Sequence, residues 1–168
     1  MTPEQGKVLF KVFTETMKME SEITTKVLRA VPEDKKSYKP DPKAKSAHEL
    51  AWHLAQSEVW FLDLLLSGKL EWVEPPAAPP TISAILDWYH TNYQDRFSKL
   101  EKMPSEHFVA EVPFFAGEGK VPLITYANFM NLHSSHHRGQ LSTYLRPMGS
   151  KIPSIYGGSA DEPFQGGQ

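Results

Sequence analysis

Three of the seven histidines of this 168-residue chain fall within one short stretch, His133, His136 and His137 in H-S-S-H-H-R-G-Q. On a helix, residues four apart lie one turn above each other, so His133 and His137 can aim their imidazoles at a common point. Two neutral imidazoles placed in this way form half of a metal site. The spacing therefore predicts a pair of metal ligands on one helix.

The neighbours of this pair indicate that it faces the protein interior. Apolar residues share its face of the helix: Leu123, Tyr126, Met130, Leu141, Tyr144 and Met148. His136 lies about 100° from this stripe and is predicted to be a flank or surface residue. The alternative is that His133 and His137 are core histidines satisfied by polar partners. Burying both would leave four ring nitrogens to satisfy, so the two interpretations stay open.

Composition restricts the class of protein. The chain is 40% hydrophobic and 23% charged, which is typical of one globular domain covering residues 1–168. It has no cysteine, so any metal must be held by nitrogen and oxygen. The net charge of −2 and the scattered basic residues argue against nucleic-acid binding. Without an apolar run of membrane-spanning length or a secretory leader, we expect a cytoplasmic protein that binds no membrane.

Hydrophobic periodicity predicts four amphipathic helices, over residues 3–31, 47–67, 82–103 and 122–145. The hydroxyl residues Thr2, Ser46 and Thr81 precede the first three and are expected to cap them. Ser46 with Glu49 three residues later fits the capping-box pattern. The predicted inner face of the first helix is Val8, Val12, Met19, Ile23 and Val27.

The segments between the helices are rich in proline and glycine. Residues 32–43 are expected to be an exposed crossover, residues 71–80 a stiff extended linker, and residues 104–122 a long loop or small hairpin. The predicted fold is therefore all-α, a four-helix bundle with long crossover connections. If the second and last helices are neighbours, His53 lies opposite the histidine pair and supplies a third nitrogen ligand. His48, His90, His107 and His136 share no face with these three and are not expected to bind the metal.

Two stretches, S-A-H-E-L-A-W-H-L-A and H-S-S-H-H-R-G-Q-L, together with the tail I-P-S-I-Y-G, resemble the DinB/YfiT-like family of metal-binding four-helix bundles. The resemblance covers most of the chain and places the family's metal triad on His53, His133 and His137. It implies a divalent metal, zinc or nickel, and a homodimer. Because some relatives are metal-dependent thiol S-transferases or isomerases, it also implies a low-molecular-weight thiol as a small-molecule partner.

Two main functions follow from these observations. One is an enzyme in which the metal keeps an open position and activates a water or a small thiol. The other is a non-catalytic metal-binding bundle that dimerises, and a metal-free bundle is a third interpretation. No general acid or base stands out among its four candidates, Glu58, Tyr126, Gln140 and Tyr144. If the protein is a transferase, we expect a pocket walled by residues 104–122 or by the tail around Tyr156.

Overall fold

A computed structural model describes residues 1–164 and consists mainly of four long helices. The helices are α1 (Pro3–Arg29), α2 (Ala47–Ser67), α3 (Ile82–Leu100), α4 (Ser105–Val109) and α5 (Thr125–Leu145), with a 3-10 turn η1 at Glu33–Lys35. Two short strands, β1 (Glu111–Pro113) and β2 (Lys120–Pro122), form an antiparallel hairpin. The predicted all-α bundle is confirmed, with this hairpin as a small addition.

The helix starts follow from the capping residues. Thr2 and Gln5 form a capping box at α1, and Ser46 and Glu49 form another at α2. The Thr81 hydroxyl accepts a hydrogen bond from the third residue of α3. These caps satisfy backbone N–H groups that have no partner inside the helix.

Three predicted boundaries were wrong by a few residues. The first helix ends at Arg29, two residues before the predicted end, and α3 ends at Leu100, three residues before it. The last helix begins at Thr125, because Lys120–Pro122 pairs with β1 instead of starting the helix. Val112 faces Val121 in this pairing.

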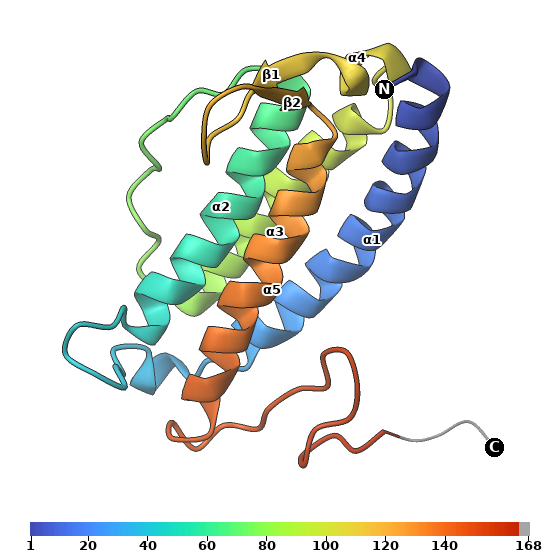
Figure 1. The fold of residues 1–168 in the computed structure, drawn as a ribbon. Helices are drawn as coiled ribbons and strands as arrows, with labels where there is room; N and C mark the ends of the chain where they lie inside the picture. The colour runs from blue at the N-terminus through green and yellow to red at the C-terminus, as the bar shows by residue number, and fades with distance from the viewer. Residues whose placement is uncertain (165–168) are drawn as a thin grey trace.

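The four long helices surround one core in the order α1, α5, α2, α3 (Figure 1). In the figure α2 and α3 run in one direction, whereas α1 and α5 run in the other. Two neighbouring parallel helices need a connection as long as the bundle, which residues 68–81 provide along its outside. The extended linker predicted over residues 71–80 is thus confirmed, whereas the proline-rich segment after α1 joins two helix ends at the same end of the bundle (Figure 1).

The hairpin and α4 close the end of the bundle that holds the N-terminus (Figure 1). Phe108 of α4 is fully buried, and its ring stacks on that of Phe10 with centroids 4.0 Å apart. A side chain at Gly6 would collide with Val109, so glycine permits the close approach of α1 and α4. The segment before α5 is therefore fixed to α1 at one end.

The predicted inner face of α1 was partly wrong. Val8, Val12 and Met19 are each more than half exposed, whereas Glu20 and Thr24 are buried. The buried stripe contains polar residues that bond to α5 and α2, so hydrophobicity alone gave the wrong rotation. Ile23 and Val27 lie in the core as expected.

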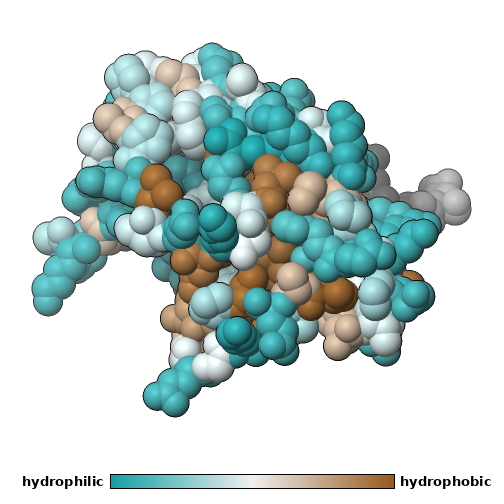
Figure 2. Space-filling model, turned by 90° about the horizontal axis from the view of Figure 1, so that it is seen from above, coloured by the Kyte–Doolittle hydropathy of each residue, from teal (hydrophilic) through white to brown (hydrophobic). Residues whose placement is uncertain are grey.

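The surface at the hairpin end is uneven in its hydrophobicity (Figure 2). Seen from above, hydrophobic atoms reach the surface in the lower half of the view, whereas the upper half is mostly hydrophilic. Across residues 1–164, no helix combines the length and the apolar character needed to cross a bilayer.

Candidate metal centre

The structure brings together His53 from α2 and His133 and His137 from α5. Each offers a ring nitrogen, and the three nitrogens lie within 4.8 Å of one another. The Nε2 atoms of His53 and His137 are 3.1 Å apart. The rings of His133 and His137 have their centroids 4.3 Å apart, as expected for residues one helical turn apart. The pairing of α2 with α5 supplies the third histidine that the sequence placed opposite this pair.

All three imidazoles are held in the neutral form. Burial lowers the pKa of His53 to about 4, and the neighbouring His137 adds to this effect. Burial and the adjacent histidines likewise lower the pKa of His133 to about 4. The pKa of His137 is also lowered, mainly by burial. Neutral imidazoles carry the free electron pair that a metal ion needs, so the environment favours ligation over protonation.

Hydrogen bonds direct one ring of the group and leave another without a partner. His137 Nδ1 lies 2.7 Å from Gln140 Oε1, so Nδ1 carries the proton and Nε2 keeps its electron pair. The buried His133 Nδ1 finds no hydrogen-bond partner within residues 1–164. A buried nitrogen without a partner is costly in a structural histidine but is expected of a metal ligand. The three residues therefore fit a divalent metal.

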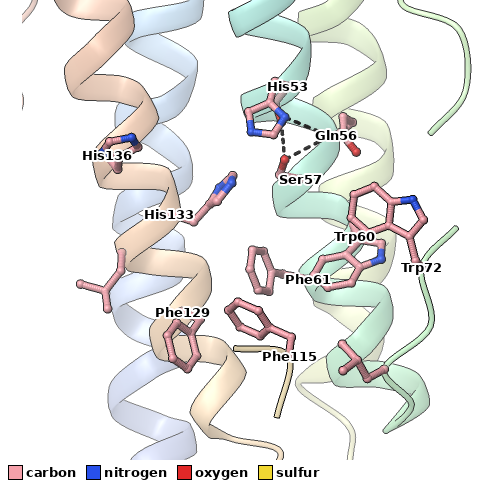
Figure 3. A pocket seen from close by; sticks show the side chains of 12 residues that line it. His53, Gln56, Ser57, Trp60, Phe61, Trp72, Phe115, Phe129, His133 and His136 are labelled. Carbon is pink, nitrogen blue, oxygen red and sulfur yellow. Dashed lines mark hydrogen bonds between the residues drawn. The ribbon is translucent and has the colours of Figure 1, made fainter. Parts of the chain in front are cut away.

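A cavity of about 730 Å³ opens beside the three histidines (Figure 3). Its walls come from α2, α5, the loop of the hairpin and the segment that follows α2. The lining residues are His53, Gln56, Ser57, Trp60, Phe61, Leu70, Trp72, Phe115, Phe129, Leu132, His133 and His136. Residues 104–122 were expected to form part of the wall, and they contribute Phe115. The candidate centre therefore has direct access to a largely aromatic space.

Of the two walls that the sequence offered as alternatives, the tail is not used, because Tyr156 does not line this cavity. Its hydroxyl donates to Glu20 Oε2 at 2.7 Å and lies 2.6 Å from Ser135 Oγ, on the side of α5 that faces α1. The segment after α2 takes the place expected for the tail, through Leu70 and Trp72. Its aromatic residue was visible in the sequence, but no local pattern indicated where it would pack.

The other four histidines are not part of the triad. His48 and His107 bond through Nε2 to the carbonyl oxygens of Pro79 (2.8 Å) and Leu65 (2.7 Å). His90 Nε2 pairs with a threonine hydroxyl of α1 at 3.0 Å. His136 stays outside the group but lines the cavity, which its assignment to the helix flank did not anticipate.

Of the four candidates for a general acid or base, three have structural contacts away from the cavity. The Tyr126 hydroxyl donates to Pro113 O at 2.6 Å and so holds the hairpin loop. Tyr144 packs edge-on against the ring of Tyr38. Glu58 is fully buried, and burial raises its pKa. The fourth, Gln140, orients His137 and has no proton to exchange.

A buried polar network lies on the opposite side of α5. The Arg138 side chain pairs with the Glu20 carboxylate and donates to Thr24 Oγ1 at 2.9 Å. Thr24 in turn donates to Glu58 Oε1 at 2.7 Å, and Tyr89 also donates to Glu58. The network thus joins α5, α1, α2 and α3. Charged residues on α1 and α5 were visible in the sequence, but their pairing across 118 positions was not.

The fold and this site define a four-helix bundle with a candidate three-histidine metal centre. The family model described as "DinB family" matches residues 5–165, which is nearly the whole chain. The protein belongs to the DinB family, and the resemblance seen in the sequence is confirmed.

Similar proteins agree with this assignment. The chain is 23% identical over 154 residues to the uncharacterised protein YrdA of Bacillus subtilis, covering 89% of each sequence. A crystal structure of a DinB-like protein from Bacillus cereus superposes with a TM-score of 0.73 at 21% identity, covering 86% of this chain and 95% of the other. The DinB-like protein YjoA of Bacillus subtilis gives a TM-score of 0.69 at 22% identity, covering 85% and 96%. These two structures support the fold.

Proposed function

We propose that the protein is a metal-dependent enzyme in which His53, His133 and His137 bind one divalent ion, zinc or nickel. In its reaction, the sulfur of a low-molecular-weight thiol, or the oxygen of a water, forms a bond to a small electrophile and displaces a leaving group, which departs with the electron pair of the broken bond, while the nucleophile gives up its proton. The observation that carries this proposal is that the three ring nitrogens converge beside a cavity that two of their residues, His53 and His133, line.

The ligand set supports a catalytic site over a structural one. No carboxylate or fourth histidine joins the group among the residues that the structure describes. Structural zinc sites are closed by four protein ligands, whereas catalytic sites have three and keep one position open. A divalent ion with an open position lowers the pKa of a bound water or thiol and so supplies a nucleophile at neutral pH.

Residues around the triad have separate tasks in this proposal. Gln140 holds the proton of His137 on Nδ1 and so keeps Nε2 directed at the ion. His136 is the titratable side chain that lines the cavity outside the triad, within the described part of the chain. We assign it the proton released when the nucleophile forms.

Metal analysis of protein purified without a nickel column tests the first half of the proposal. We expect one equivalent of metal per chain in the native protein and in His136→Ala, and loss of metal in His133→Ala. His136 is the matched control, because it lies on the same helix and beside the same cavity. Loss of metal from His136→Ala with retention in His133→Ala would contradict the assignment of the ligands.

An activity assay tests the second half. The metal-loaded protein is mixed with a panel of low-molecular-weight thiols and a chromogenic electrophile, with His133→Ala as the blank. We expect conjugation above the blank for at least one thiol and a slower rate in His136→Ala. Rates equal to the blank for every thiol, and no hydrolysis of the electrophile, would reject the enzyme.

A non-catalytic metal-binding bundle that dimerises is the second candidate. The observation that favours it is the exposed apolar side of α1, where Val8, Val12 and Met19 are more than half accessible. Such a surface can pack against a second copy of the chain. X-ray absorption spectroscopy separates the two candidates, since a fourth protein ligand would favour the structural site. Light scattering of Val12→Glu against the native protein tests the dimer.

A further inference from the structure

The cavity beside the triad has a chemical character of its own. Aromatic and aliphatic side chains form most of its wall, and they fall into two groups. Trp60 of α2 and Trp72 of the following segment lie on one side, with ring centroids 5.9 Å apart. Phe115 and Phe129 lie on the other, with centroids 5.1 Å apart and rings nearly perpendicular. Figure 3 shows both groups extending from the histidines toward the hairpin end.

One aromatic ring connects this wall to the candidate metal centre. Phe61 lies with its centroid 5.7 Å from that of His133, in an edge-to-face arrangement. A ligand whose polar group reaches the histidines therefore has its remaining atoms among aromatic rings. Flat apolar groups pack well against such rings, both offset-stacked and edge-on.

The wall is unsuited to a charged ligand body. Of the residues that line the cavity within the described chain, none is Asp, Glu, Lys or Arg. Apart from the indole N–H groups of its two tryptophans, its polar side chains are His53, His133, His136, Gln56 and Ser57. A carboxylate or ammonium group placed among the aromatic rings would lose its hydration without gaining a partner of opposite charge.

A second hollow in the same molecule provides a contrast. The groove between α1 and α3 is lined by Lys18, Glu22, Lys26, Arg29 and Glu101 as well as by aromatic residues. Both hollows have a similar volume, about 730 and 620 Å³. The lack of charge beside the triad is therefore a property of that cavity and not of the surface in general.

The rim of the cavity keeps large apolar groups in contact with water. Trp72 is 80% exposed, and Phe115 and Leu132 are also more than half exposed. Covering these side chains with an apolar ligand would remove them from water, which is favourable. Exposed apolar patches beside a candidate site are typical of ligand-binding surfaces.

We propose that this cavity binds uncharged molecules with an aromatic body and one metal-binding group, which is directed at His53, His133 and His137. This inference rests on the proposed metal-dependent function and names its substrate class. In the conjugation reaction, the aromatic molecule is the electrophilic acceptor, and a three-histidine zinc site that expands to five ligands would hold both its metal-binding group and the thiol. Trp72 is a specificity-determining residue, because it forms part of the wall but lies outside the helices that carry the histidines.

Calorimetric titration of the zinc-loaded protein with three hydroxamic acids tests the ligand class. 2-Naphthohydroxamic acid should bind at least about tenfold more tightly than acetohydroxamic acid, since both share the metal-binding group and only one has an aromatic body. 4-Carboxybenzohydroxamic acid should bind about tenfold more weakly than benzohydroxamic acid, because its carboxylate would enter an uncharged wall. Equal affinities within both pairs would overturn the inference.

Two variants locate the effect. Trp72→Ala should reduce the preference for the naphthyl compound about fivefold or more. The matched control is Val73→Ala, since Val73 is the exposed neighbour of Trp72 and does not line the cavity. Both residues are largely exposed, so neither substitution threatens folding. An unchanged preference in Trp72→Ala would overturn the role of this residue.

A probe without a metal-binding group separates this inference from the proposed function. N-phenyl-1-naphthylamine is uncharged and fluoresces when it enters an apolar site. We expect it to bind the metal-free protein, and to bind Trp72→Ala more weakly. If the protein takes up no metal but binds this probe through Trp72, the proposed function fails and the aromatic cavity stands. If it takes up metal and no probe distinguishes aromatic from aliphatic groups, the cavity assignment fails alone.

Discussion

Two neighbouring residues of α5, which lie about 100° apart around its axis, face parts of the molecule with different chemistry. His137 faces α2 and converges with two more imidazoles, those of His53 and His133, which line an open cavity. Arg138 is 1% exposed and faces α1, where it pairs with a carboxylate and two hydroxyl groups. The side that faces α1 holds the buried charge of Arg138, which the Glu20 carboxylate neutralises. The other holds neutral nitrogens, one of which has no partner in the described chain.

The difference shows how the bundle can position a site without closing it. A buried charged network is costly to disturb, so it fixes the rotation of α5 relative to α1. With α5 fixed on one side, the histidines on its other side are held in place although they bond to little else. The side of α5 that faces α1, which we call the closed side, is thus structural. The side that faces α2 and the cavity, which we call the open side, is available for a ligand.

Breaking the closed side should have the largest effect. Arg138→Met leaves the Glu20 carboxylate buried without its partner, and removing one member of a buried pair costs about 3–5 kcal/mol of unfolding free energy. Urea denaturation of the metal-free protein measures this cost. Arg146→Met is the matched control, because Arg146 pairs with Asp161 at the surface and should cost about 0–1 kcal/mol. Equal costs for both variants would contradict the structural role of the network.

Acid should lower the unfolding free energy of the metal-free protein, because two histidines of the open side have lowered pKa values. His53 and His133 have a pKa of about 4 in the folded state, against 6.5 in the unfolded chain. Between these values the unfolded chain binds more protons, so stability is complete above about pH 6.5 and falls as the pH approaches 4. Urea midpoints measured from pH 7 to pH 5 in EDTA should decrease steadily.

The matched control for this pH dependence is a double variant with His53→Gln and His133→Gln. Its urea midpoint should depend less on pH than that of the native protein. Glu58, whose pKa burial raises, contributes with the opposite sign in both proteins, so the difference between their slopes reports the histidines. Identical slopes would show that these imidazoles keep ordinary pKa values.

Removing the hydrogen-bond partner of His137 on the open side should weaken metal binding and leave the fold intact. Gln140→Ala removes the acceptor that orients His137, and loss of such a partner typically costs about 10–100-fold in metal affinity. A competition titration with a chelator measures the affinity, and thermal unfolding of the metal-free protein measures stability. Thr143→Ala one turn further on is the control, since its hydroxyl bonds only to the helix backbone. An unchanged affinity in Gln140→Ala would remove this glutamine from the site.

The smallest effect is expected where the tail joins the closed side. Tyr156→Phe removes a hydroxyl that donates to Glu20, and the loss of such a bond costs about 1–2 kcal/mol. The ring itself is largely exposed, so the rest of the change is neutral. Urea denaturation measures the cost, and metal content should stay the same. A loss of metal in this variant would show that the two sides of α5 are more tightly coupled than the contacts indicate.

The sequence predicted the open side better than the closed one. His133 and His137 share an apolar stripe, and His53 needed only the packing of α2 beside α5. Regular periodicity and capping residues gave the helices, because both are local properties.

The closed side was not predicted, because hydrophobic periodicity assigns polar residues to the surface and this side of the helix buries polar residues. Glu20 and Thr24 are polar but buried, so the rotation of α1 was assigned to its exposed valines. Burial of such residues depends on partners far away in the chain, which hydrophobicity does not register. The position of Trp72 was missed for a related reason, since an extended segment has no periodicity to reveal its packing.

The segment between α2 and α3 forms part of the cavity wall but carries none of the three histidines, so the two can change independently during evolution. Its end is tied by Lys36 Nζ to Pro80 O at 2.6 Å, and its start by Trp60 Nε1 to Glu71 O at 3.1 Å. Between these ties it runs outside the bundle (Figure 1). Substitutions, insertions or an exchanged loop at this position can therefore alter the cavity while the helices that carry the histidines stay unchanged. It is the place where new ligand preferences of the cavity can evolve, or be selected from a library, at little cost to folding.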